Sequence, residues 1–177
     1  MGANEQGANE TANRWLTIPR TLCFVFNGED ILLMKRAPHK RVFPNRYNGV
    51  GGHIERDEDP LTSARREILE ETGLQVRDVR LCAVYNIDAG EATGIVLFVF
   101  TAQSDSREVV ANSEGTLHWV ARQKLIELDL VEDLPHLLPR ILALSRGDFP
   151  LFVHVSYDPD DVIQMRFADY EARENLE

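Results

Sequence analysis

Three glutamates lie within five positions of one segment, Glu67, Glu70 and Glu71, at a spacing that a divalent metal ion can use. In a helix they would fall together within an arc of roughly 100°. Carboxylates this close repel one another, which raises their proton affinity unless a positive charge lies between them. Mg²⁺ prefers hard oxygen ligands and is usually shared with substrate phosphates. The segment therefore indicates either a solvated acidic face or a metal site, and Arg66 is placed to hold one of the glutamates.

The glutamates need a helix to position them, and the flanking residues predict one. Asp59 is a suitable N-cap, Pro60 fits the first helical position, and Gly73 is a suitable C-terminal stop. The helix would run for about three and a half turns between Asp59 and Gly73. Its apolar stripe is expected to contain Leu61, Ala64 and Ile68.

Strand-like runs surround this helix and predict an α+β domain with a mixed sheet. Residues 21–35 read as a hairpin whose two strands meet at Asn27 and Gly28. In the second half of the chain, Pro135 lies near an expected helix start, and Pro139 should kink or restart that helix. Interspersed strands and helices favour a mixed sheet packed by helices. The other expected elements are strands at 79–87, 94–102 and 117–120, helical segments at 121–128 and 134–144, and a final hairpin over 151–157 and 162–170.

Length and charge restrict the function classes. The 177 residues fit one domain with a sizeable core, expected over 15–172 between a flexible N-terminal tail, 1–14, and a short C-terminal tail, 173–177. The net charge of −10 argues against a broad surface for duplex nucleic acid, which needs a basic footprint. A phosphorylated small substrate is still compatible with this charge, because a bound cation can supply the positive charge.

The cysteines, the apolar runs and the N-terminal residues predict a cytoplasmic protein without a membrane partner. Cys23 and Cys82 lie in apolar runs and are expected to be buried, reduced thiols, since their separation gives no metal-knuckle spacing. No apolar run is long enough to span a bilayer. The N-terminus lacks the charged and then apolar pattern of a signal peptide.

The residues around the glutamates follow a longer pattern that matches the Nudix box without a mismatch. Seven fixed identities and two apolar positions would agree by chance about 10⁻⁹ of the time per starting point. The chain therefore resembles the Nudix family, and in the stretches described below its MutT-like members of the 8-oxo-dGTP diphosphatase type. The matching residues are Gly52, Glu58, Arg66, Glu67, Ile68, Glu70, Glu71, Gly73 and Leu74.

The resemblance implies the Nudix fold, an α/β/α sandwich, and hydrolysis of a nucleoside diphosphate linked to another group with Mg²⁺ or Mn²⁺. Metal ions would neutralise the diphosphate, lower the pKa of the attacking water and stabilise an in-line displacement. On the family pattern the three box glutamates are metal ligands or the base that activates water, and the carbonyl of Gly52 completes the shell. Glu58 and Arg66 would orient the loop and the helix.

Three further stretches indicate the MutT-like group. "YNGVGGHIE" is similar to the "WNGFGG" segment in which an asparagine reads the purine, so Asn48 takes that place, although Asn-Gly is also an ordinary turn signal. Glu114, five residues before Trp119, matches a late-loop metal ligand, with a solvated loop residue as the alternative. Near the last helix, Glu132 and Asp133 would face the base with the register shifted by one, and helix capping by Asp133 is an equal interpretation.

A basic loop stands out in this acidic chain and is interpreted in two ways. Its first residues, Lys35 and Arg36, would bind the outer phosphates of a nucleotide, or the loop is simply solvated. His53, next to Gly52, is interpreted as a strand residue. The other basic residues of the loop are His39, Lys40, Arg41 and Arg46.

The leading functional prediction is hydrolysis of an oxidised purine nucleoside triphosphate, 8-oxo-dGTP, to the monophosphate and pyrophosphate. The alternatives are ADP-ribose or another ADP-sugar, a dinucleoside polyphosphate, or an ordinary triphosphate. A non-catalytic nucleotide-binding module is disfavoured because all box glutamates are retained. An isoprenyl diphosphate isomerase is disfavoured because neither cysteine has suitable surroundings. The choice between a monomer and a homodimer, and between Mg²⁺ and Mn²⁺, stays open.

Overall fold

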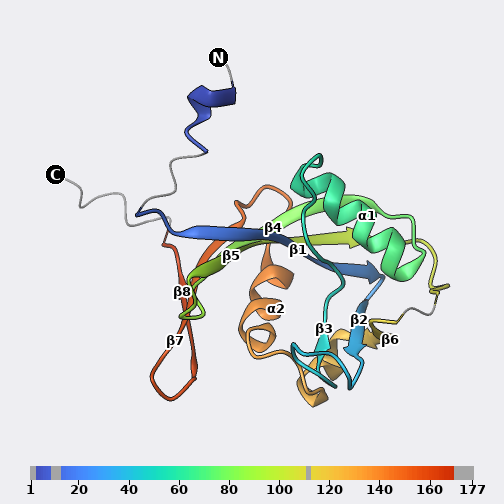
Figure 1. The fold of residues 1–177 in the computed structure, drawn as a ribbon. Helices are drawn as coiled ribbons and strands as arrows, with labels where there is room; N and C mark the ends of the chain where they lie inside the picture. The colour runs from blue at the N-terminus through green and yellow to red at the C-terminus, as the bar shows by residue number, and fades with distance from the viewer. Residues whose placement is uncertain (1–2, 9–12, 111–112, 170–177) are drawn as a thin grey trace.

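A computed structural model describes residues 3–8, 13–110 and 113–169 of the chain (Figure 1). Within the predicted N-terminal tail, residues Ala3–Gln6 form a 3-10 helix, η1. The predicted C-terminal tail, 173–177, and the predicted domain end at 170–172 lie outside the described residues, as do tail residues 1–2 and 9–12.

Eight strands form one mixed sheet in the order β3-β2-β1-β5-β4-β7-β8, with β6 paired to β2. β1 pairs with β5 and β4 pairs with β7 in parallel, and the other pairs are antiparallel. Both predicted hairpins, β1–β2 and β7–β8, are present. The strands are β1 Leu16–Asn27, β2 Asp30–Arg36, β3 Tyr47–Asn48, β4 Arg77–Ile87, β5 Thr93–Gln103, β6 Gly115–Ala121, β7 Leu151–Tyr157 and β8 Ile163–Phe167.

Two α-helices complete the fold, α1 (Pro60–Thr72) and α2 (Leu134–Ala143). The segment predicted as helical over 121–128 is a 3-10 helix, η2 (Arg122–Glu127). Of the kink or restart predicted at Pro139, the restart is wrong, because α2 continues through this residue to Ala143, and the kink stays a prediction. Only one backbone hydrogen bond is lost there, and buried side chains of the helix, such as Leu138, hold it against the sheet.

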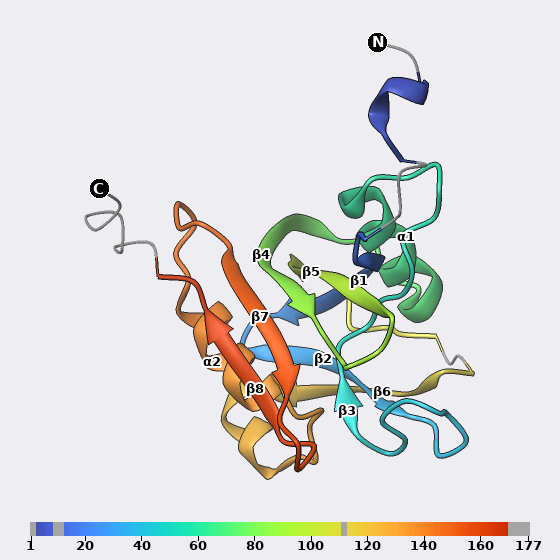
Figure 2. The same cartoon turned by 60° about the vertical axis from the view of Figure 1, so that its left-hand side comes forward.

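The helices cover opposite faces of the sheet, which confirms the predicted α/β/α sandwich (Figure 1). Alternate residues of β1 point to opposite faces, so Cys23 and Val25 pack toward α1 while Phe24 and Phe26 pack toward α2. At the far edge, β8 lies beside α2, with the guanidinium of Arg140 4.1 Å from the Phe167 ring centre (Figure 2). The buried residues of α2 are Leu134, Leu137, Leu138 and Ile141.

The buried apolar face of α1 differs from the predicted one at one position. Leu61, in the first turn, is 41% exposed, because the buried side chains of α1 begin only after it. Both cysteines are free and buried, as expected. No helix in the described part of the chain combines the length and the apolar character needed to cross a membrane. The buried residues of α1 are Ser63, Ala64, Ile68 and Thr72.

Candidate active site

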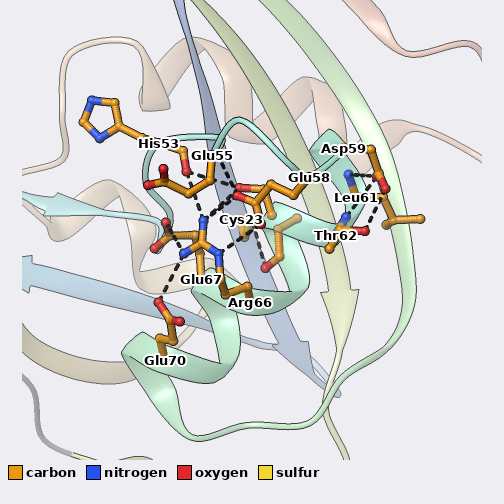
Figure 3. Close-up of polar contacts among 12 residues, drawn as sticks. Cys23, His53, Glu55, Glu58, Asp59, Leu61, Thr62, Arg66, Glu67 and Glu70 are labelled. Carbon is orange, nitrogen blue, oxygen red and sulfur yellow. Dashed lines mark hydrogen bonds and ion pairs between the residues drawn. The ribbon is translucent and has the colours of Figure 1, made fainter.

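The ends of α1 form as the sequence predicts and fix the helix beside the glycine-rich loop. The Asp59 carboxylate accepts hydrogen bonds from the amides of Leu61 and Thr62 at 2.8 and 3.0 Å (Figure 3). Gly73 has a φ of 75°, which favours glycine, and its amide donates to the carbonyl of Leu69. The caps fix where α1 begins and ends, and its buried residues Ser63, Ala64, Ile68 and Thr72 turn the acidic face away from the core.

Arg66 lies at the centre of the polar contacts between this loop and α1 (Figure 3). It donates two hydrogen bonds to the Glu58 carboxylate, at 2.6 and 3.0 Å, and these bonds hold the pKa of Glu58 down at about 2. It also donates to Glu67 at 2.9 Å, to Glu70 at 3.1 Å and to the carbonyl of His53 at 3.0 Å. One guanidinium therefore orients two of the three glutamates and ties the loop to the helix.

The Glu67 carboxylate packs directly against Gly52. A Cβ at position 52 would lie 2.4 Å from Oε1 of Glu67, so any larger residue here would displace this carboxylate. The carbonyl oxygen of Gly52, expected to be a metal ligand, accepts a hydrogen bond of 2.8 Å from the amide of Thr21. A carbonyl oxygen has a second lone pair, so ligation by Gly52 stays a prediction.

Glu71 lies half-buried beside the same loop. Its Oε2 accepts a hydrogen bond of 2.9 Å from the amide of Gly51. Burial raises the pKa of Glu71 to about 7, and the negative charges of Glu67 and Glu114 add to the rise, while the Gly51 hydrogen bond and the Arg36 charge oppose it. The late-loop Glu114 and two box glutamates therefore act electrostatically on one another.

The basic loop after β2 reaches the same region through Lys40. The Lys40 ammonium makes an ion pair with the Glu114 carboxylate. The backbone amide of Ala37 donates to the carbonyl of Glu114, which fixes the two loops side by side. The loop thus supplies the glutamate group with a cation of its own.

The two basic residues predicted to bind phosphates lie on opposite faces of β2, because successive strand residues alternate. Arg36 lies on the α1 face, where its charge acts on Glu71, and its Nε donates to the carbonyl of Val42 at 2.8 Å. The Lys35 ammonium instead lies 5.7 Å from the centre of the Tyr47 ring, which packs against the core beneath α2. Only Arg36 of this pair faces the glutamates.

Asn48 pairs with Met34 across β2 and β3, on the α1 face. Its Oδ1 accepts a hydrogen bond of 2.8 Å from the amide of Gly49, so the turn contact considered as the alternative role is present. Its side-chain nitrogen donates to no other described residue. The side-chain nitrogen of Asn48 is therefore a donor that could contact a purine.

Asp133 and Glu132 lie at the start of α2. Asp133 occupies the N-cap position but makes no capping hydrogen bond with its side chain, so the helix-capping interpretation is wrong. Burial raises the pKa of Asp133 to about 6, and its charge acts on the buried Tyr85. Glu132 accepts a hydrogen bond of 3.0 Å from Arg46. The pKa of Tyr157 is raised mainly by burial, and the negative charges of Glu132 and Asp133 raise it further.

Sequence analysis missed the two tyrosines of this group. Tyr85 on β4 and Tyr157 on β7 point to the same face, because Tyr85 pairs with Val153 in the parallel register and strand residues alternate. The only signal in the sequence is an aromatic residue in each of two strand-like runs. Their proximity depends on the pairing of β4 with β7, which no local pattern predicts.

Asp133 supplies a stability prediction that depends on pH. Its pKa of about 6 in the folded state exceeds the usual value of 3.8. The folded state therefore holds the proton more tightly, so stability is lost progressively as the pH rises from about 4 to about 6, and the loss is complete above that. We expect Asp133→Asn to raise the free energy of unfolding at pH 8 by on the order of 2 kcal/mol. The gain should shrink as the pH falls through 6 and vanish below about 4, as measured by chemical denaturation.

Asp57→Asn, at an exposed position of the loop before α1, is the control for this experiment. It should leave stability unchanged across the same pH range. A gain for Asp133→Asn of equal size at pH 4 and pH 8 would contradict the electrostatic explanation.

The donor set of the site fits a hard divalent cation, because it consists of carboxylate oxygens. Among the described residues, no three acidic, histidine or cysteine side chains stand arranged around one point as metal ligands do. Glu67 and Glu70 contact Arg66, Glu71 contacts the Gly51 amide, and Glu114 contacts Lys40. The raised pKa of Glu71 reflects burial and repulsion by neighbouring carboxylates, which a bound cation would relieve.

A three-layer domain with a capped helix of glutamates and an arginine that locks the loop before it defines a nucleotide hydrolase of the pyrophosphate-cleaving class. The model of the NUDIX domain family matches residues 16–141, and the chain belongs to this family. This confirms the resemblance and the fold class. The chain is therefore assigned to the hydrolases of this family that act on nucleotide pyrophosphate bonds, as its relative NudI, a nucleoside triphosphatase, does.

Two curated relatives show the range of the family. The nucleoside triphosphatase NudI of Enterobacter sp. (strain 638) is 32% identical over 117 residues, which cover 60% of this chain and 83% of NudI. The m7GpppN-mRNA hydrolase NUDT17 of Danio rerio is 36% identical over 75 residues, which cover 42% of this chain. That match spans a quarter of NUDT17, 25% of its length.

Solved structures agree with this assignment. The MutT protein of Bacillus halodurans superposes with a TM-score of 0.70 at 25% identity, over 85% of this chain and 97% of that chain. The NUDIX domain of Shewanella oneidensis NrtR, solved in complex with ADP ribose, superposes with a TM-score of 0.60 at 19% identity, over 79% and 96%. The second likeness concerns the fold alone.

Proposed function

We propose that the protein is a metal-dependent pyrophosphohydrolase that converts 8-oxo-dGTP to the monophosphate and pyrophosphate with Mg²⁺ or Mn²⁺. The observation that carries the proposal is the electrostatic coupling of Glu67, Glu71 and Glu114 in one group. Such a group is suited to hold a cation against a polyphosphate. The likeness to a nucleoside triphosphatase and to a MutT protein supports a triphosphate substrate.

The metal would be held by the box glutamates and Glu114, with the Gly52 carbonyl completing the shell, and would supply charge neutralisation and water activation. Arg66 keeps Glu67 and Glu70 oriented through its hydrogen bonds. Arg36 and Lys40, on the side of the site formed by the loop after β2, are the cations available to the outer phosphates. Holding these groups in place before substrate arrives is what lowers the barrier to displacement.

Glu114 supplies a prediction about metal affinity. Glu114→Gln removes one charge from the carboxylate group but leaves the box glutamates in place. We expect full turnover at saturating Mg²⁺, with the concentration for half-maximal activity raised about tenfold. A metal titration of initial rates measures this shift.

Glu108→Gln, at an exposed position ahead of the same loop, is the matched control and should titrate like the parent chain. A Glu114→Gln titration curve that coincides with that of the parent would mark Glu114 as a loop residue without a metal role.

The base would lie at the sheet edge where β3 meets the segment before α2, which are joined by the hydrogen bond from the Val131 amide to the Tyr47 carbonyl. Asp133 would read it from the α2 side and Asn48 from the α1 side of this edge. Oxidation of guanine at C8 turns N7 from a hydrogen-bond acceptor into an N–H donor. Asp133, whose pKa of about 6 leaves it ionised at neutral pH, can accept from this donor. Asn48 offers a side-chain donor on β3. A site built on such hydrogen bonds disfavours a base that lacks the partner, because its buried groups are then left unpaired.

The test is a panel of nucleotides assayed with Mg²⁺, with phosphate and pyrophosphate release measured separately. We expect a higher kcat/KM for 8-oxo-dGTP than for dGTP, with pyrophosphate as the product. Asn48→Ala and Asp133→Ala should each reduce this ratio by about tenfold or more, since they read the base and not the diphosphate. Asp129→Ala, whose side chain is 73% exposed four residues before Asp133, should leave the ratio unchanged.

The second candidate substrate class is a nucleotide linked to a larger group, such as ADP-ribose or a dinucleoside polyphosphate. The observation that favours it is the local identity to an m7GpppN-mRNA hydrolase, which is higher than the identity to NudI. The same panel separates the classes. A preference for ADP-ribose or a dinucleoside polyphosphate over both guanine triphosphates would overturn the 8-oxo-dGTP proposal and keep the hydrolase.

A further inference from the structure

A cavity of about 280 Å³ lies on the α2 side of the sheet and carries an unusual concentration of arginine. Three of its ten lining residues are arginines, whereas the chain as a whole has a net charge of −10. Its other walls are polar strand residues and apolar residues from β1 and the end of α2. We call it the arginine cavity; its residues are Phe26, Asp78, Arg80, Thr101, Gln103, Arg122, Ile141, Leu142, Leu144 and Arg146.

The arginine cavity is separate from the glutamate site, because the two lie on opposite faces of the sheet. Phe26 and Ile141 belong to the core beneath α2, and Arg80 pairs with Thr101 on that face. The Glu67 side chain stands on α1, which packs on the other face. The proposed base-reading residue Asp133 is on the α2 side but at the start of α2, whereas the cavity lies at the end of this helix. An anion in the cavity would therefore not be a nucleotide bound at the metal site.

Arg122 gives the cavity an unused hydrogen-bond donor. Its Nε atom is buried and has no hydrogen-bond partner among the described residues. Its guanidinium lies 5.2 Å from the centre of the Phe26 ring, and Nη1 lies 3.6 Å from the carboxylate of Glu29, beyond hydrogen-bond distance. A buried donor without an acceptor is costly for a protein. Nε is closed to solvent, but the Arg122 side chain is 34% exposed, so a small turn of the guanidinium would bring this donor to an anionic oxygen in the cavity.

The other two arginines are partly accounted for by structural roles. Arg80 donates to the carbonyls of Ser145 and Leu144, which end α2, and Arg146 donates to Asp78 at 2.9 Å. Positive charge is still in excess here, because the three lining arginines and the neighbouring Arg77 face two carboxylates, Asp78 and Glu29. Two of the five N–H groups of Arg80 make its contacts. Helix capping explains Arg80 but explains neither the Arg122 donor nor the surplus charge.

We propose that the arginine cavity binds a phosphate monoester with a small apolar or aromatic body. Arginine forks recognise phosphate oxygens through paired hydrogen bonds. The apolar wall from Phe26, Ile141 and Leu142 would contact the organic part. The volume of about 280 Å³ lies just below the usual range of ligand pockets, about 300–1,000 Å³, so one phosphate and one ring fit better than a dinucleotide.

Calorimetry with phenyl phosphate, inorganic phosphate and benzyl alcohol tests the proposal on the full chain in EDTA, which removes metal-dependent binding. Phenyl phosphate should bind at least about tenfold more tightly than either other probe, because only it offers both the anion and the ring. Arg122→Gln and Arg146→Ala should each weaken its binding by about tenfold. The Arg146 side chain is 86% exposed, so its loss does not endanger the fold.

Lys124→Ala is the matched control, since it removes the same charge from an exposed position of η2 outside the cavity, and its affinity should equal that of the parent. Glu67→Gln should also bind phenyl phosphate normally, whatever its activity, which separates this test from that of the hydrolase. Three results would overturn the proposal: no binding to the parent chain at millimolar concentration, equal binding by the Arg122→Gln, Arg146→Ala and Lys124→Ala variants, or loss of binding in Glu67→Gln.

Discussion

Replacing Glu67 with glutamine should lower kcat at least about a hundredfold while the fold stays intact. The substitution keeps the shape of the side chain but removes the charge that pairs with Arg66 and acts on Glu71. The same loss is expected for Glu70→Gln and Glu71→Gln. The fold should survive because the helix packs on the sheet through Ser63, Ala64, Ile68 and Thr72. Initial rates in metal-buffered assays measure the effect, and thermal unfolding checks the fold.

Glu91→Gln is the charge-matched control, since this exposed residue lies in the loop between β4 and β5. It should retain the activity of the parent chain. Turnover close to that of the parent in all three box variants, with metal in excess, would remove the glutamates from the active site.

Local sequence signals predicted the elements and the glutamate helix. Asp59 and Gly73 mark the ends of α1 because capping depends on a few neighbouring residues. The β1–β2 hairpin follows from the short turn after Asn27. The sheet order could not be predicted in the same way, since β1 pairs in parallel with β5, which begins at Thr93, far along the chain. Pairing over such a distance is decided by the packing of the whole domain.

At the site, too, the sequence predicts contacts within one element but not contacts between distant elements. The box placed Glu67, Glu70, Glu71 and their partner Arg66 together because one helix carries them all. It could not show that Lys40, from a distant loop, is the cation beside Glu114. Nor could it show that the half-buried Asp133 acts on Tyr85, because that interaction joins the start of α2 to β4.

Gly52→Ala should lower kcat by about tenfold to a hundredfold through Glu67, without a large loss of stability. Gly52 does not have a positive φ, so alanine can adopt its backbone conformation. The added Cβ would lie 2.4 Å from Oε1 of Glu67, which must move away. A displacement of this kind misplaces a ligand by an ångström or so, and such errors cost about a hundredfold in rate. Rates and thermal unfolding, measured together, separate the two effects.

The neighbouring glycine provides the contrast. Gly51 has a φ of 147°, and a Cβ there would lie 2.3 Å from the backbone carbonyl oxygen of Thr21, which cannot turn aside as a side chain can. We expect Gly51→Ala to lower the midpoint of thermal unfolding clearly, whereas Gly52→Ala should leave it nearly unchanged. Equal losses of stability in the two variants would contradict the assignment of Gly52 to the site.

A double substitution decides whether Gly52 acts through Glu67. If its only role is to leave room for that carboxylate, the loss caused by Gly52→Ala should largely disappear in a chain that already carries Glu67→Gln, with less than about a threefold further decrease in kcat. If the decrease in kcat of the double variant instead equals the product of the two single decreases, Gly52 contributes independently of Glu67. The remaining group at that position is its carbonyl, which already accepts the Thr21 amide, so independence would support ligation by the carbonyl's second lone pair.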